Sequence, residues 1–110
     1  MKPIKINGKD VPKVIRKKAR RIVELHERKD ILGLRALRDS STNFEINIYH
    51  HSQGTDSYYH DTERQYYRWT EIEQLTESKL KEPNKYFAVV VLEYKPGVLF
   101  VKRSIDYKLN

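Results

Sequence analysis

The sequence feature that most constrains the fold is an apolar run of strand length, Tyr86–Leu92, within the segment YFAVVVLEY. Successive side chains of a strand point to opposite faces, so a run without alternation predicts a central strand that is apolar on both faces. The run is far shorter than the roughly 18 apolar residues that a membrane helix needs. The chain is therefore expected to fold around a sheet that contains Tyr86–Tyr94.

Three further segments are expected to extend this sheet. Phe44–Tyr49 alternates apolar and polar residues, which is typical of a half-buried strand. Tyr58–Trp69 is rich in aromatic residues and predicts one long strand or two short ones, split near Asp61–Arg64. The turn Lys95-Pro96-Gly97 predicts that Val98–Ile105 returns as an antiparallel partner.

Helical periodicity appears in three segments. Apolar residues recur at steps of three and four from about Val11 to Arg28, with Asp10 as the expected N-cap and Pro12 in the first turn. Asp30 is expected to cap a second, short helix, Ile31–Arg38. A third helix is expected to start at a capping box formed by Thr70 and Glu73 and to end at Pro83. Before the first helix, Lys2–Lys9 is either a short edge strand or an extended arm.

The order helix, helix, strand, strand, helix, strand, strand predicts an α+β fold, with an antiparallel sheet and the helices on one face. At 110 residues the chain has the length of one domain. Within it, residues 1–40 form a basic helical arm and residues 41–110 form the core of sheet and helix.

The positive charge is concentrated in the first forty residues. These contain 13 Lys or Arg against 5 Asp or Glu, a net charge of +8, whereas residues 41–110 contain 9 against 10. Such an asymmetry indicates a polyanionic partner, and the alternative is a solvated helix face that is rich in Lys and Arg. The residues expected to form a basic ridge on the first helix are Lys13, Arg16, Lys17, Arg20 and Arg21.

Composition excludes several classes of protein. The chain has no cysteine, which excludes a disulfide scaffold, a zinc ribbon and thiol catalysis. Its four glycines are isolated, so no glycine-rich loop is present to cradle nucleotide phosphates. The N-terminus carries no apolar signal region, and we expect a cytoplasmic protein without membrane contact and without a cofactor.

The segment Phe44–Trp69 concentrates the remaining chemistry, with three of the four histidines, five of the eight tyrosines and the only tryptophan. A metal site is not expected, because strand alternation separates His50 from His51 and the following helix supplies no ligand. Acid–base chemistry on RNA remains an alternative, in which His51, His60, Tyr59 and Arg64 would supply a base, an acid and a phosphate clamp.

Aromatic recognition is the third interpretation of this segment. In each of the doublets Tyr58-Tyr59 and Tyr66-Tyr67, one ring should face the core and one should face outward. Outward Tyr rings beside His and Arg serve to stack nucleobases or to anchor interfaces. The residues expected to form this surface are Tyr49, His51, Tyr59, His60, Arg64 and Tyr67.

The pattern Phe44-Glu45-Ile46, His51-Ser52 and Tyr59-His60-Asp61 resembles a segment of small phage-encoded proteins, among them basic anti-CRISPR inhibitors of Cas9. It covers about 18 of the 110 residues, and no functional residue is carried over from it. The resemblance implies a non-enzymatic inhibitor that binds a nucleoprotein and touches its RNA or DNA through the basic arm.

From the sequence we therefore expect a small, non-enzymatic binding protein that engages nucleic acid or a nucleoprotein such as a Cas effector. The basic ridge would meet phosphates, and the tyrosine and histidine surface would supply specificity. The alternatives are a small ribonuclease toxin that uses His51 and His60, a DNA-binding regulator, and an oligomer-forming structural protein.

Overall fold

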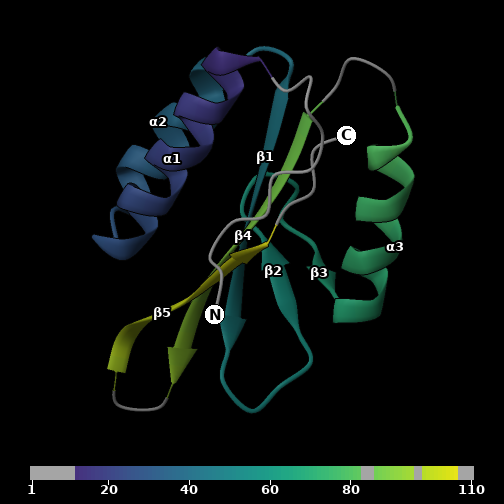
Figure 1. Cartoon of the computed structure of the whole chain (residues 1–110). Coiled ribbons are helices and arrows are strands. Elements are labelled where there is room, and N and C mark those ends of the chain that lie inside the picture. The colour runs from purple at the N-terminus through teal and green to yellow at the C-terminus, as the bar shows by residue number, and fades with distance from the viewer. Residues whose placement is uncertain (1–11, 83–85, 96–97, 107–110) are drawn as a thin grey trace.

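The computed structural model describes residues 12–82 and 86–95, and the backbone of residues 98–106. The expected edge strand Lys2–Lys9, the Asp10 cap and the Pro96-Gly97 turn lie outside the described residues. Within those residues the chain forms three helices and five strands (Figure 1): α1 Lys13–Glu27, α2 Ile31–Ser40, β1 Phe44–Ser52, β2 Tyr58–His60, β3 Tyr66–Tyr67, α3 Trp69–Leu80, β4 Tyr86–Lys95 and β5 Val98–Asp106. The predicted order of elements is confirmed, with Tyr58–Trp69 divided into two short strands and the start of α3.

The described strands form one mixed sheet in the order β3-β2-β1-β4-β5. The β1–β2, β2–β3 and β4–β5 pairs are antiparallel, whereas β1 and β4 run parallel, with Phe44 opposite Tyr86 and Ser52 opposite Tyr94. The prediction of an antiparallel sheet is therefore wrong at its centre. After β2 and β3 have added to one side of β1, the chain crosses through α3 and adds β4 to the other side, and such a helical crossover permits a parallel pair.

Helices cover both faces of the sheet, so the prediction that they lie on one face is also wrong (Figure 1). α1 and α2 pack against a cluster that includes Ile48, Val90 and Leu92. On the opposite face, Ile72 of α3 packs with Tyr49, Phe87, Val89 and Val91. Helices pack against both faces of β4, and this explains why the β4 sequence is apolar on both faces.

Because α3 covers the second face, β1 is buried on both sides rather than half-buried. Asn47 is 9% exposed and Tyr49 is 3% exposed, although the sequence placed both on a polar, outward face. Alternation correctly separated the two sets of side chains in β1. It did not reveal that a helix would cover the polar set.

The α1 helix buries the predicted stripe, including Ile15, Ala19 and Ile22, and leaves Val14 exposed. Its N-cap is Pro12, and its first turn begins at Lys13. At its end, the amides of Lys29 and Asp30 donate to the carbonyls of His26 and Leu25, which is the hydrogen-bond pattern of a Schellman motif. Asp30 then caps α2 as predicted, because its carboxylate accepts the Gly33 amide at 2.8 Å.

The α3 helix begins at Trp69, earlier than the capping box predicted at Thr70 and Glu73. Glu71 accepts the Arg68 amide at 2.9 Å, and Asp56 accepts the Trp69 amide at 3.0 Å. Asp56 comes from the β1–β2 loop, 13 residues upstream, so this cap depends on tertiary structure. No helix in the described part of the chain is long and apolar enough to cross a membrane.

Candidate functional site

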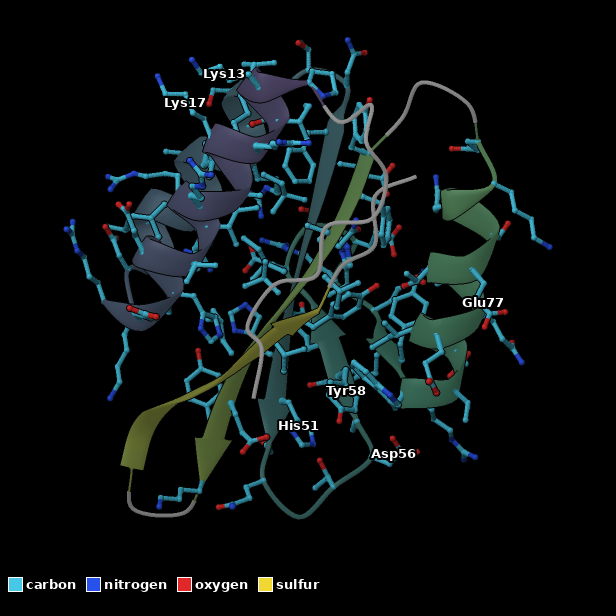
Figure 2. All side chains as sticks on the ribbon, viewed as in Figure 1. Lys13, Lys17, His51, Asp56, Tyr58 and Glu77 are labelled. Atoms are coloured by element: carbon cyan, nitrogen blue, oxygen red, sulfur yellow. The ribbon has the colours of Figure 1, made fainter. Side chains whose placement is uncertain are left out.

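The outer face of α1 carries the predicted basic ridge. Lys13, Arg16, Lys17, Arg20 and Arg21 are all exposed, and Figure 2 shows Lys13 and Lys17 on the side of α1 that faces away from the sheet. Arg21 pairs with Glu24 at 3.0 Å. Within the described residues, no carboxylate lies at ion-pair distance from the other four cations of the ridge. Among the residues that the structure describes, their charge is therefore not neutralised by an ion pair.

The opposite helical layer has the opposite charge. α3 carries Glu71, Glu73 and Glu77 against Lys79 alone, and Figure 2 shows Glu77 on its outer side. A hollow of about 600 Å³ runs beside α3 and has Asp39, Glu45, Glu63 and Glu82 among its lining residues. These carboxylates outnumber Lys79 and Arg38 in the same lining. The outer face of α1 is therefore positively charged, whereas α3 and the hollow beside it carry more carboxylates than cations.

Asp61 links α2 to the end of β2 through a cluster of charge-assisted hydrogen bonds. Arg35 donates to both of its carboxylate oxygens, at 3.0 and 2.8 Å, and Arg38 donates at 2.6 Å. The Nε2–H of His50 donates to the same carboxylate at 2.8 Å. Burial alone would raise the pKa of Asp61, but the bonds from Arg35, His50 and Arg38 outweigh it and hold the pKa well below its ordinary value of 3.8.

The cluster fixes the orientation of His50 and of Arg35. The Nδ1 atom of His50 lies 3.1 Å from the Tyr94 hydroxyl, so both of its ring nitrogens are engaged. The Asp61 side chain is only 8% exposed, whereas that of Arg35 is 41% exposed. Arg35 is thus held in position by Asp61 and still reaches solvent on the same side of the sheet as α1.

Tyr59 and Tyr66 form an aromatic pair beside this cluster. They are opposite each other in the β2–β3 ladder, and their ring centroids are 4.9 Å apart. Tyr66 is 70% exposed. With His50 and Tyr94 they line a second hollow of about 400 Å³. Sequence reasoning chose Tyr67 of the second doublet as the outward ring, and the structure shows that Tyr66 is the outward one.

His51 is buried, in contrast to its predicted place on the surface. Its Nε2–H donates to the Thr55 carbonyl at 2.7 Å, and its Nδ1 lies 3.1 Å from a Glu93 carboxylate oxygen. Its ring stacks on Tyr58 at 4.1 Å, and Figure 2 shows these two side chains close together near the end of the hairpin. The residue therefore closes the β1–β2 loop.

His60 is also buried rather than exposed. Its Nδ1 accepts the backbone amides of Thr62 at 3.3 Å and Glu63 at 3.0 Å, so its Nε2 carries the proton and donates to Asn47 at 2.8 Å. Burial lowers the pKa of His60 below 6.5, against the opposing effect of Glu63 and Asp61. The neutral ring stabilises the turn that follows β2.

Tyr49 and Tyr67 belong to the cluster under α3 and not to an outward surface. Tyr49 meets His60 and Tyr67 edge-on, at 4.9 and 6.0 Å between ring centroids, and burial raises its pKa above the ordinary value of 10. Tyr67 is partly buried, and the hydrogen bond that it donates to Glu63 raises its pKa to about 12. Arg64 is exposed in the turn after β2, where its φ of 59° is left-handed.

The predicted site residues thus lie on two different sides of the sheet. The basic ridge and Tyr59 lie on the side of α1, and Tyr49, His51, His60 and Tyr67 lie on the side of α3. Sequence reasoning missed His50, Arg35 and Tyr66. The signal that points to His50 is its place in β1, on the same face as Ile48 and therefore toward α1 and α2. Among the described residues, no three His, Asp or Glu side chains gather to hold a metal ion.

Comparison with protein families, curated proteins and solved structures gives no match to this chain. Its function is accordingly inferred from the two charged layers and the aromatic pair.

Proposed function

We propose that this protein binds nucleic acid through the outer face of α1. The observation that supports the proposal is the set of four exposed cations, Lys13, Arg16, Lys17 and Arg20, which have no carboxylate partner within the described residues. Surface cations that no acidic neighbour neutralises attract phosphates. When the nucleic acid binds, the counterions condensed on its phosphates are released, which favours binding.

The spacing of these cations suits a phosphate backbone. A helix rises 1.5 Å per residue, so positions 13, 16, 17 and 20 follow one face over about 10 Å. A surface of this length meets several consecutive phosphates of one strand. Arg35, on the neighbouring helix, is 41% exposed and has Asp61 as its ion-pair partner, so it can donate to a phosphate but adds less charge than the four cations of α1.

The proposal is tested by the salt dependence of binding. Fluorescence anisotropy with a labelled oligonucleotide is measured from 50 to 200 mM salt for the wild type and for the double variant Arg16→Glu/Arg20→Glu. The slope of log affinity against log salt is negative. Two lost phosphate contacts should make it shallower by roughly 1.4 to 1.8 and should weaken binding at every salt concentration.

The matched control is Lys81→Glu/Lys95→Glu, which changes the net charge equally at two exposed positions away from α1. We expect this control to bind nearly as well as the wild type. Equal losses in both double variants would show that net charge alone matters, and the α1 face would then be an ordinary solvated surface.

A nucleoprotein partner is part of the same proposal. Inhibition of a nucleoprotein such as a Cas effector, implied by the resemblance to phage-encoded inhibitors, would use the α1 face to touch its RNA or DNA. A pull-down with and without nuclease treatment separates the possibilities. Capture that survives nuclease and is lost in Arg16→Glu/Arg20→Glu would indicate a protein surface as the principal target.

The alternative of a ribonuclease that uses His51 and His60 has less support. Each ring nitrogen of both residues already has a hydrogen-bond partner. A general acid or base needs one nitrogen directed at substrate. A DNA-reading role for α2 is equally weak. Its exposed Leu32 and Ala36 offer no donor or acceptor to a base edge, and its exposed Asp39 and Ser40 already form hydrogen bonds with Arg38 and with the Leu37 carbonyl.

A further inference from the structure

The hollow beside Tyr59 and Tyr66 lies on the same side of the sheet as α1. α2 packs against β1, and α1 packs against β4 and β5. Tyr59 pairs with His50 of β1, whose ring faces the α2 side, so Tyr59 and Tyr66 lie beyond the edge of the helix pair. This position explains why Tyr66 is 70% exposed, whereas Tyr58, whose ring lies on the other face of the sheet, is buried.

The lining of this hollow combines rings with polar groups. Tyr59, Tyr66 and Tyr94 supply aromatic surface, and Ser52, Thr55 and Ser57 supply hydroxyl groups at the rim. Its volume of about 400 Å³ lies in the range of small-molecule sites, roughly 300 to 1,000 Å³. The Arg35 guanidinium uses two of its N–H groups on Asp61 and keeps the others for an anion.

We propose that this hollow binds one unpaired base of a single-stranded nucleic acid. The base stacks on Tyr66, its polar edge meets the hydroxyl groups of the rim, and the adjoining phosphate contacts Arg35. A base inside a duplex cannot reach the hollow, because both of its faces are stacked and its pairing edge is occupied. The inference rests on the proposed function, and it specifies that the preferred ligand is a single-stranded nucleic acid rather than a duplex.

The test uses the full chain and two probes of one sequence, a labelled single-stranded oligonucleotide and the same strand annealed to its complement. Stacking on one aromatic ring should make Tyr66→Ala bind the single strand roughly 5- to 150-fold more weakly. The salt slope should stay that of the wild type, because no phosphate contact is removed. Affinity for the duplex should not change.

Two control variants test whether the loss of binding comes from the aromatic ring of Tyr66. Tyr66→Phe retains the ring and should bind the single strand within about threefold of the wild type if stacking on the ring is the main interaction. Leu32→Ala removes an apolar side chain that is 75% exposed on α2 and should change neither probe. Because Tyr66 and Leu32 are both largely exposed, none of these substitutions disturbs the core.

The outcomes separate the two proposals. If Tyr66→Ala binds the single strand like the wild type while Arg16→Glu/Arg20→Glu does not, the base site is wrong and nucleic-acid binding stands. Equal wild-type affinity for the single strand and the duplex would also overturn the base site. If the wild type binds neither probe at 50 mM salt, both proposals are wrong.

Discussion

Asp61 joins α2 to the sheet through hydrogen bonds to residues of both. Its buried carboxylate accepts hydrogen bonds from Arg35, Arg38 and His50, and its own amide donates to the Ile48 carbonyl at 2.9 Å. Loss of the negative charge would leave Arg35 without its carboxylate partner and Arg38 with the exposed Asp39 alone. The cost of such a loss is large because one partner of a buried pair remains unpaired.

We predict that Asp61→Asn lowers the free energy of unfolding at pH 7 by about 2 kcal/mol, less than a fully buried pair because Arg35 reaches solvent. The folded-state pKa of Asp61 is depressed, so its contribution is complete above its ordinary pKa of 3.8 and decreases as the pH falls toward the folded-state value. Urea unfolding followed by Trp69 fluorescence should therefore show a difference between the proteins that shrinks below pH 3.8.

The control for this prediction is Asp39→Asn. Asp39 also pairs with Arg38, at 2.9 Å, but its side chain is 69% exposed. Its replacement should change the free energy of unfolding by less than about 0.5 kcal/mol. A difference between wild type and Asp61→Asn that stays constant from pH 7 to pH 3 would contradict the role assigned to the Asp61 charge.

His60 acts at the same scale, as a neutral acceptor inside a turn. Its folded-state pKa lies below 6.5, so its contribution is complete above pH 6.5 and is lost as the pH falls toward the folded-state value. We predict that long-range ¹H–¹⁵N NMR shows the Nε2–H tautomer at pH 7, with titration below 6.5. A ring that titrates above 6.5 would refute the structural role and would revive acid–base chemistry at this residue.

At the scale of elements, Gly33 sits where α1 and α2 meet. A Cβ atom at this position would lie 2.6 Å from both a carboxylate oxygen of Asp30 and Cδ2 of Leu25. Asp30 caps α2, and Leu25 is buried in the core. The glycine therefore permits the tight junction of the two helices, at a propensity cost of about 1 kcal/mol relative to alanine.

We predict that Gly33→Ala lowers the free energy of unfolding by about 1 kcal/mol, although alanine is the better helix former. The lost cap and the displaced Leu25 together outweigh the gain in propensity. Urea denaturation measures the change. Ala36→Gly, at an exposed position of the same helix, measures the effect of helix propensity without a packing contact. It should lower the free energy of unfolding by about 1 kcal/mol. A Gly33→Ala protein more stable than the wild type would show that the contact relaxes freely.

At the scale of the whole molecule, the parallel pair β1–β4 lies between two layers of helix that carry opposite charge. Ile48 and Val90 at its centre are fully buried, whereas β3 at the edge of the sheet has only two residues. Sheet and helix layers thus form a core whose stability is greatest at β1 and β4 and least at β3.

We predict that hydrogen exchange measured by NMR follows this order. The amides from Val89 to Leu92 and the inner amides of β1 should exchange most slowly, at the rate of global unfolding. The amides of Tyr66 and Tyr67 should exchange through local opening at much lower free energy. If β3 were as protected as β4, the edge that carries the aromatic pair would be part of the central folding unit.

Much of the fold is readable from the sequence because it depends on local patterns. Helical spacing placed α1, the Asp30 cap placed α2, and the unbroken apolar run identified β4 as a central strand. The start of α3 was misplaced because its first free amide is capped by Asp56 from a distant loop. The role of His60 was missed for a similar reason, since Asn47 and the turn amides that hold it meet only in the folded chain.

The sequence by itself determined the elements, the basic face of α1 and the alternation within β1, because these follow from backbone geometry and the order of side chains. Only the tertiary structure decided that β1 and β4 are parallel and that α3 covers the second face. That cover buries Tyr49. His51 and His60 are buried by contacts with the β1–β2 loop and with the turn after β2, and Tyr66 stays exposed. Which face of a strand meets solvent depends on what packs against it, and this contact joins residues that are far apart in the chain.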